Sequence, residues 1–115
     1  MTTADVLVIG GGTMGTAAGW ALARAGHSVI VLEQFGHVHT FGSHGGKTRI
    51  FRHAYAEGEQ YVPWTLDADR LWSELQQRSG KEFMYRTGGL DISAEDGGWA
   101  HQARSSAERY GIPHE

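Results

Sequence analysis

The sequence predicts an α/β fold that opens with a β-α-β unit. Two short apolar runs, Val6-Leu7-Val8-Ile9 and Val29-Ile30-Val31-Leu32, have the branched composition of buried parallel strands. The stretch between them, about Thr13 to Ala25, is typical of a helix, and Gly26 suits its C-terminal stop. A glycine cluster joins the first run to this helix.

The glycine cluster has the spacing G-x-G-x-x-G, formed by Gly10, Gly12 and Gly15. The first glycine permits a tight turn, the second lets a pyrophosphate approach the backbone, and the third lets the helix pack on the sheet. The helix N-terminus offers free N–H groups and a partial positive charge to phosphates. Glu33 ends the second apolar run, where a carboxylate can accept hydrogen bonds from a ribose diol. The motif in this context predicts dinucleotide binding rather than a purely structural turn.

The residues around Glu33 narrow the choice of dinucleotide. Gln34 follows, and no Arg or Lys is close, so a 2′-phosphate would meet a carboxylate without a cation, which argues against NADP. FAD and NAD both remain possible on these residues. Gly19 favours FAD slightly, because a further small residue lets the helix lie closer under the cofactor.

The bulk properties exclude several classes of protein. The chain has 115 residues, of which 40% are hydrophobic and 20% charged, so it is globular rather than disordered. A net charge of −3 gives no electrostatic footprint for nucleic acid or an acidic membrane surface. Without cysteine, disulfides and thiolate chemistry are excluded in this stretch. The N-terminus has no basic region and only a short apolar run, so we expect a cytoplasmic location and no membrane span.

The length also limits how much of a fold the chain can form. A complete dinucleotide fold has about six parallel strands, and each β-α-β unit takes about 30 residues. Only one such unit is visible here, so we expect an incomplete fold that belongs to a longer protein. The expected domains are a nucleotide-binding unit with its following loop, residues 1–57, and the start of a substrate-side region, residues 58–115.

The second half of the chain predicts two helices and a hairpin. One helix fits Pro63 to Ser79, with Trp64 and Trp72 on an apolar stripe that we expect to be core. Asp67 and Asp69 on the same helix are expected to be solvated.

Residues 83–85 and 90–92 flank Gly88-Gly89 and predict a hairpin or two strand pieces. The last helix fits about Asp96 to Tyr110, with Trp99, Ala103, Ala107 and Tyr110 on one face.

Candidate site residues gather in the loop over residues 34–47 and just after it. Glycines, hydroxyls and cations over 42–49 suit contact with phosphates or a polar ring system, although a mobile surface loop has the same composition. Arg49 and Arg52 are suited to bidentate capture of a carboxylate, or are surface arginines.

The histidines of this region indicate a function less specifically than the arginines do. His44 and His53 are acid/base candidates or plain polar residues. His37 and His39 alternate without a third ligand, so no metal site is expected. Since no Ser-His-Asp set, P-loop or zinc signature is visible, the chemistry would come from a bound cofactor.

Several segments together carry a resemblance to a known family. They are Val8–Gly15, His39-Thr40, Gly42-Ser43-His44, Thr48-Arg49-Ile50, Arg52–Tyr55, Glu57-Gly58-Glu59, Tyr61-Val62-Pro63 and Leu71–Leu75. The sequence resembles the N-terminal part of the monomeric sarcosine oxidase and N-methyltryptophan oxidase family, which belongs to the D-amino-acid-oxidase-like flavoproteins.

The resemblance implies a Rossmann-like FAD-binding unit in an enzyme that oxidises the C–N bond of a secondary amino acid such as sarcosine or N-methyltryptophan. A hydride equivalent passes to the flavin, the imine hydrolyses, and oxygen is reduced to hydrogen peroxide. The positions implied in cofactor binding are Gly10, Gly11, Gly12, Thr13, Met14, Gly15, Glu33, Ser43, Thr48 and Arg49. Those implied in the reaction are Arg49, Arg52 and His44, with Arg52 reaching the substrate carboxylate.

The chain also departs from the family pattern. Gly45 and Lys47 stand where the family often has a second histidine and an acid, which leaves the substrate open. The family's covalent flavin cysteine and oxygen-activating lysine would lie beyond residue 115. The alternatives are an NAD-linked dehydrogenase and a truncated, non-catalytic nucleotide-binding fragment whose partner is the missing C-terminal part.

Overall fold

The computed structural model describes residues 2–36, 39–94 and 97–115. The chain forms two compact units, Met1–Arg49 and Ile50–Glu115, which we call unit 1 and unit 2. The predicted domain boundary between residues 57 and 58 remains a prediction. None of the helices in the described part of the chain is long and apolar enough to cross a membrane.

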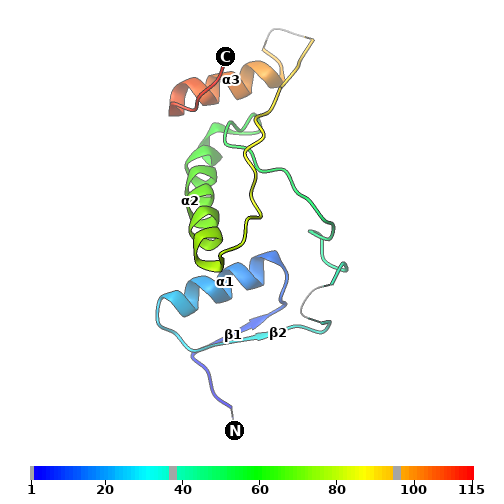
Figure 1. Ribbon diagram of the computed structural model, residues 1–115, viewed down its shortest axis with the longest axis vertical. Coiled ribbons are helices and arrows are strands. Elements are labelled where there is room, and N and C mark those ends of the chain that lie inside the picture. The colour runs from blue at the N-terminus through cyan, green and yellow to red at the C-terminus, as the bar shows by residue number, and fades with distance from the viewer. Residues whose placement is uncertain (1, 37–38, 95–96) are drawn as a thin grey trace. The chain divides into compact units, whose positions relative to one another are not determined.

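Unit 1 is the β-α-β unit that the sequence predicts. Strand β1 (Val6–Ile9) is followed by helix α1 (Thr13–Arg24) and strand β2 (Val29–Leu32). The two strands are parallel, with Val6 opposite Val29 and Ile9 opposite Leu32, and α1 lies over one face of them (Figure 1). The predicted opening of the fold is therefore confirmed.

The close approach of α1 to the strands depends on glycine. Gly19 is buried, and a Cβ atom added there would lie 3.0 Å from Cγ2 of Val31. On the strands, Leu7, Ile9 and Leu32 are at least half exposed. Parallel sheets are normally covered on both faces, so these exposed apolar side chains form a surface that is suited to burial.

Unit 2 contains two helices that end on glycine. A short 3₁₀ turn (η1, Glu59–Tyr61) leads into α2 (Val62–Ser79), and α3 (Trp99–Tyr110) follows later. Gly80 and Gly111 both adopt φ of +65°, the left-handed conformation that glycine tolerates at a helix C-terminus. The predicted start of the last helix, Asp96, lies outside the described residues, and the described helix begins after its N-cap Gly98.

The predicted hairpin does not form. Residues 81–94 belong to no helix or strand, and the chain there runs back along α2 toward α3 (Figure 1). The backbone N–H groups of Phe83 and Met84 both donate to Oε1 of Gln76, each at 3.0 Å. The Gln76 side chain of α2 therefore accepts the hydrogen bonds that a partner strand would otherwise accept. Gly88 has φ of +69°, but the segments on either side of it do not pair as strands.

The core of unit 2 also differs from the prediction. Trp64 and Trp72 are 70% and 42% exposed, so their assignment to the core was wrong. The buried positions lie in α3 and in the chain just before and at the start of α2: Ala56, Val62, Ala103, Ser106 and Ala107. The predicted apolar face of α3 is confirmed as buried at Ala103 and Ala107, whereas Trp99 on the same face is 38% exposed.

The two aspartates of α2 have different environments. The Asp67 side chain is 72% exposed, as expected, whereas that of Asp69 is only 17% exposed. Arg86 Nη2 donates to both carboxylate oxygens of Asp69, at 2.9 and 2.8 Å, and His53 Nε2 lies 3.4 Å from the same carboxylate. The prediction of a solvated Asp69 was wrong because the irregular segment after α2 covers it.

Candidate functional site

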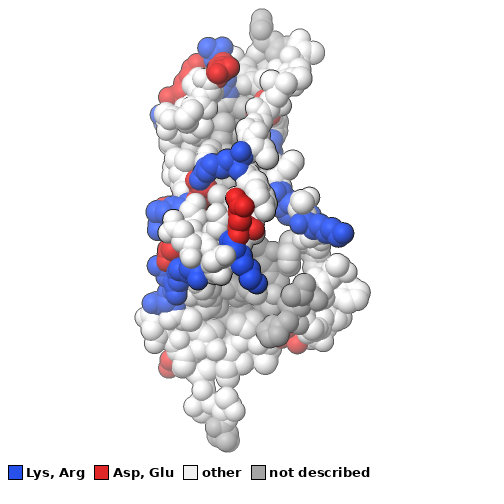
Figure 2. All heavy atoms as spheres, in the orientation of Figure 1, with Lys and Arg blue, Asp and Glu red and all other residues white. Residues whose placement is uncertain are grey.

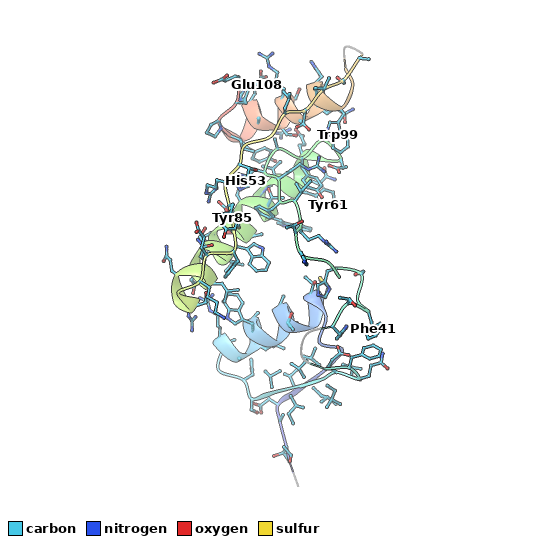
Figure 3. All side chains as sticks on the ribbon, turned by 45° about the vertical axis from the view of Figure 1, so that its right-hand side comes forward. Phe41, His53, Tyr61, Tyr85, Trp99 and Glu108 are labelled. Atoms are coloured by element: carbon cyan, nitrogen blue, oxygen red, sulfur yellow. The ribbon has the colours of Figure 1, made fainter. Side chains whose placement is uncertain are left out.

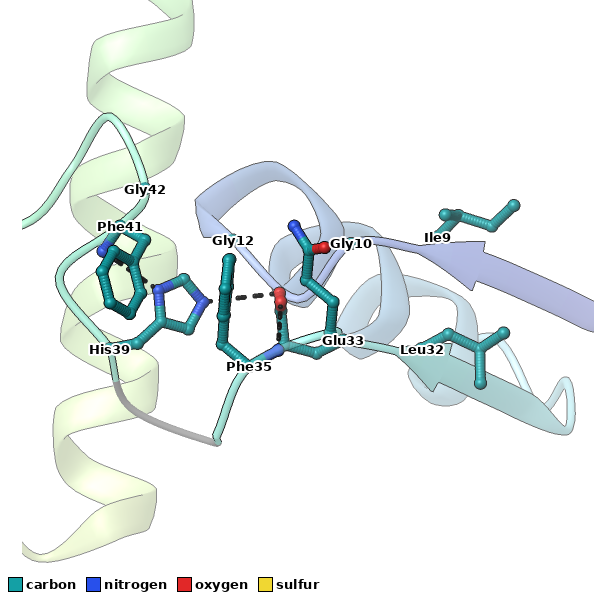
Figure 4. Close-up of a pocket in the computed structure, with 10 residues that line it drawn as sticks. Ile9, Gly10, Gly12, Leu32, Glu33, Phe35, His39, Phe41 and Gly42 are labelled. Carbon is teal, nitrogen blue, oxygen red and sulfur yellow. Dashed lines mark hydrogen bonds and ion pairs between the residues drawn. The ribbon is translucent and has the colours of Figure 1, made fainter.

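Unit 1 contains a pocket of about 600 Å³ at the carboxyl ends of β1 and β2. Figure 4 shows the residues that line it: Ile9, Gly10, Gly12, Leu32, Glu33, Gln34, Phe35, His39, Phe41 and Gly42. In open α/β sheets, ligands bind in the crevice outside the carboxyl ends of the parallel strands. The pocket therefore lies at the position where such a fold binds its ligand.

Glu33 is fixed at the base of this pocket by two backbone donors. Its Oε1 accepts a hydrogen bond from the Phe35 N–H at 3.1 Å, and its Oε2 accepts one from the Gly11 N–H at 2.7 Å. These two hydrogen bonds hold the pKa of the Glu33 carboxyl below its ordinary value of 4.5, and the bond from Phe35 has the larger effect. The side chain is therefore an anion at neutral pH, and its oxygens keep lone pairs for a further donor such as a sugar hydroxyl.

The three motif glycines have different structural roles. Gly10 adopts φ of +98°, which L side chains rarely adopt, and forms the tight turn out of β1. A Cβ atom at Gly15 would lie 1.8 Å from the carbonyl oxygen of Gly10, so that contact requires glycine. A Cβ atom at Gly12 would have only Cε1 of His44 within 4 Å, at 3.8 Å. The first and third glycines build the turn, and the second keeps a space open.

The space at Gly12 lies at the start of α1. Gly12 is the N-cap of this 12-residue helix, and no side chain caps it. The first N–H groups of a helix have no partner within it and carry a partial positive charge. An open glycine surface, free N–H donors and an adjacent carboxylate fit the diphosphate and ribose of a dinucleotide, and FAD has both.

Three rings form one wall of the pocket. The His39 ring lies 5.0 Å from that of Phe35 and 5.9 Å from that of Phe41, measured between centroids. The Phe41 N–H donates to Nδ1 of His39 at 3.2 Å, and Nε2 of His39 lies 3.5 Å from Oε2 of Glu33 (Figure 4). His39 thus joins the loop to the carboxylate at the end of β2.

Sequence reasoning did not identify this aromatic wall. The sequence pattern marks neither Phe35 nor Phe41, and it marks His39 only through its alternation with His37, which lies outside the described residues, and through the segment His39-Thr40 that carries the family resemblance. The usable signal was position, because residues directly after the second strand reach the crevice. In the described part of the chain, no three His, Asp or Glu side chains gather in a way that could hold a metal ion.

The other predicted residues of unit 1 lie mostly outside this pocket. The His44 ring is near Gly12, whereas Ser43 and Thr48 are exposed and are not among the described lining residues. Arg49 donates to its own loop, from Nη1 to the Thr48 carbonyl at 2.6 Å and from Nη2 to the Gly45 carbonyl. Their roles beside a flavin remain predictions.

Thr13 and Met14, the remaining predicted cofactor residues, form the first turn of α1. Both side chains are exposed, that of Met14 by 83%. What they can offer a phosphate at this place is their backbone N–H groups, because the helix has no earlier carbonyl to receive them. Their cofactor contact remains a prediction.

Arg52 belongs to unit 2 and is surrounded by one carboxylate and two rings. Its Nη2 lies 3.4 Å from Oε1 of Glu57, and its Cζ lies 5.1 Å from the centroid of the Trp99 ring and 5.9 Å from that of Tyr55. The side chain is 41% exposed, so the guanidinium is held but accessible. Its predicted contact with a substrate carboxylate remains a prediction.

His53, the other acid/base candidate, is packed inside unit 2. Its Nε2 is buried without a hydrogen-bond partner and faces the Asp69 carboxylate, which Arg86 shares.

On the face that Figure 2 shows, positive and negative side chains are interspersed over unit 2, and no single basic surface stands out.

Comparison with known proteins agrees with the geometry of the pocket. Residues 5–115 match the family described as FAD dependent oxidoreductase. N-methyl-L-tryptophan oxidases of Yersinia pestis (strain Pestoides F) and Yersinia pseudotuberculosis (serotype O:1b, strain IP 31758) are each 38% identical over 109 residues, which cover 95% of this chain. The chain spans 29% of the length of these curated relatives. With a β-α-β opening, a glycine turn and a fixed carboxylate at the strand ends, the chain belongs to the FAD-dependent oxidoreductase family.

Proposed function

We propose that the protein containing this chain is an FAD-dependent oxidase acting on the C–N bond of a secondary amino acid such as N-methyl-L-tryptophan or sarcosine. The observation that carries the proposal is the Glu33 carboxylate, bonded to the Gly11 N–H and lining the pocket at the strand ends. Family membership supports the cofactor, and the name of the relatives supports the substrate class.

The proposed cofactor contacts follow from the local chemistry of unit 1. The diphosphate lies against the turn from Gly10 to Gly15 and the N-terminus of α1, where N–H donors and the helix dipole favour negative charge. A ribose hydroxyl pair donates to Glu33. The rings of Phe35 and Phe41, 4.6 Å apart between centroids and tilted by 37°, give the pocket an apolar wall that an aromatic base could contact.

The chemistry of the reaction would come from the cofactor. A bound flavin would accept a hydride equivalent from the carbon beside nitrogen, leaving an imine that hydrolyses, while oxygen is reduced to hydrogen peroxide. The chain's own groups bind and orient. Arg52 would form a charge-assisted contact with the substrate carboxylate. Ser43, Thr48 and Arg49 would lie by the flavin or its phosphates, and His44 would serve as an acid/base group.

The test is a visible spectrum of the purified product of the complete gene, followed by peroxide detection with N-methyl-L-tryptophan and with sarcosine. We expect flavin absorbance and peroxide formation with at least one of the two. Acid precipitation then shows whether the flavin stays with the protein. A colourless protein that reduces NAD with these substrates would refute the proposal in favour of an NAD-linked dehydrogenase, and flavin without turnover would confine the protein to binding.

The role of Arg52 is tested separately. Arg52→Ala is expected to raise KM by about 10- to 100-fold, because a charge-assisted hydrogen bond contributes about 1.5–3 kcal/mol. Flavin content should stay normal. Arg104→Ala is a matched control, because Arg104 is 66% exposed and pairs with Glu108 one turn along the same helix. Equal KM values for the two variants would reject Arg52 as the carboxylate anchor.

A further inference from the structure

Helix α3 holds the segment that carries Arg52 through a hydrogen bond from a buried serine. Ser106 is only 3% exposed, and its Oγ donates to the carbonyl of Tyr55 at 2.8 Å. Residues 50–58 form no helix or strand, so this carbonyl lacks a regular backbone partner. Because a buried carbonyl without a partner is costly, the Ser106 hydroxyl fixes the backbone three residues after Arg52.

The packing around Ser106 makes this bond rigid. Ala103 and Ala107 are 4% and 2% exposed on the same face of α3, and Ala56, directly after Tyr55, is 8% exposed. Small side chains on a helix bring its backbone close to the element that it covers. The buried part of α3 therefore lies against the chain that follows Arg52.

Trp99, at the first turn of α3, acts on the side chain of Arg52. Its ring centroid lies 5.1 Å from Cζ of the guanidinium, within the range of a cation–π contact. The ring is itself held, because Nε1 donates to Oδ1 of Asp91 at 3.3 Å. Figure 3 shows Trp99 and Tyr61 on the same side of unit 2, and Tyr61 in turn lies 6.0 Å from the ring of Tyr55.

A third contact lies at the other end of α3. Arg109 pairs with Glu59 in the 3₁₀ turn that precedes α2. Positions 99, 106 and 109 are spaced by seven and three residues, so they lie on one face of the helix. A single helical face thus contacts the side chain of residue 52, the backbone of residue 55 and the side chain of residue 59.

We propose that α3 is the positioning element for Arg52, with Trp99 directing the guanidinium and Ser106 fixing the backbone that carries it. This inference rests on the proposed function, in which Arg52 anchors the substrate carboxylate. Trp99 and Ser106 are positioning residues, because neither is required to touch substrate. By holding Arg52 in place, they reduce the share of its binding energy toward a carboxylate that is lost in ordering the side chain.

The kinetic test uses the complete gene product with N-methyl-L-tryptophan and sarcosine as probes. Trp99→Leu removes the ring and is expected to raise KM about two- to fivefold with kcat nearly unchanged, whereas Trp99→Phe keeps a ring face and recovers most of the loss. Ser106→Ala is expected to raise KM about two- to tenfold. Ser105→Ala is the matched control, because Ser105 is the exposed neighbour of Ser106. Flavin content should be equal in all four variants.

A second measurement separates this inference from the proposed function. Amide hydrogen exchange over residues 52–61, without substrate, should become faster in Ser106→Ala and stay unchanged in Ser105→Ala. If Arg52→Ala raises KM but the Trp99→Leu and Ser106→Ala variants match the control in both KM and exchange, the positioning role of α3 is wrong. If exchange responds while Arg52→Ala leaves KM unchanged, α3 holds the segment but the carboxylate role of Arg52 fails, and with it the positioning proposal.

Discussion

The same substitution to alanine should destabilise the fold at Gly15 but leave it intact at Gly12. In Gly15→Ala, the new Cβ would lie 1.8 Å from the carbonyl oxygen and 2.9 Å from the carbonyl carbon of Gly10. Real Cβ contacts essentially never fall below 3.0 Å, and the obstacle is backbone rather than a mobile side chain. The turn between β1 and α1 must open for the residue to fit.

The free-energy cost of Gly15→Ala can be compared with the usual cost of overpacking a protein interior. Overpacking costs about 1–3 kcal/mol when side chains can yield, and more when the backbone must move. The better helix propensity of alanine returns only about 1 kcal/mol. We therefore expect unit 1 to lose about 2 kcal/mol or more, the upper end of the overpacking range less the helix-propensity gain, with the flavin lost as a consequence.

Gly12→Ala should leave the fold intact and still weaken the cofactor. Gly12 has φ −70° and ψ −171°, which alanine adopts without strain, and its Cβ would have only the His44 ring within 4 Å. The stability of the apoprotein should stay within about 1 kcal/mol of the wild type. The methyl group would occupy the space proposed for the diphosphate, so FAD affinity should fall at least about tenfold.

The assay combines local amide hydrogen exchange over residues 6–24 with FAD titration of the apoprotein. Exchange measures the free energy of local opening, which suits a unit within a larger protein. Wild-type exchange in Gly15→Ala would refute the steric argument. Full FAD affinity in Gly12→Ala would show that the pocket beside Gly12 does not receive the diphosphate.

Three further predictions concern carboxylates. Glu33→Gln keeps one acceptor but removes the charge, so FAD should dissociate about tenfold more readily in a titration of the apoprotein, and an unchanged Kd would contradict the ribose contact. The pKa values of Glu33 and Asp5 are lowered, by the Phe35 and Gly11 N–H groups and by Ser28 respectively, so their stabilisation is complete above the unfolded pKa and is lost as pH falls through the folded one. A circular dichroism titration should therefore be flat from pH 8 to about pH 5 and fall below about pH 4, and a transition near pH 6.5 would point to histidine instead. Asp69→Asn should cost unit 2 about 1–2 kcal/mol against less than about 0.5 for Asp67→Asn, measured by hydrogen exchange, and equal effects would deny a stabilising role for the ion pair of Asp69 with Arg86.

Local patterns in the sequence determined the opening of this fold. The branched runs gave β1 and β2 at their observed bounds, and the helix between them was predicted to within one residue at its C-terminal end. Gly80 and Gly111 stop α2 and α3 as expected, because a left-handed residue ends a helix by a purely local rule. The position of Glu33 followed in the same way, from a strand that had to end there.

Contacts between distant residues were decided only by the tertiary structure. Nothing local shows that Gln76 would bond the backbone of Phe83 and so prevent a hairpin, or that Arg86 would cover Asp69. The sequence marked the carboxylate at residue 33, but the bond from Gly11 depends on how the two strand ends meet across 22 residues. Periodicity and capping act over a few residues, whereas burial and ion pairing depend on which segments the folded chain brings together.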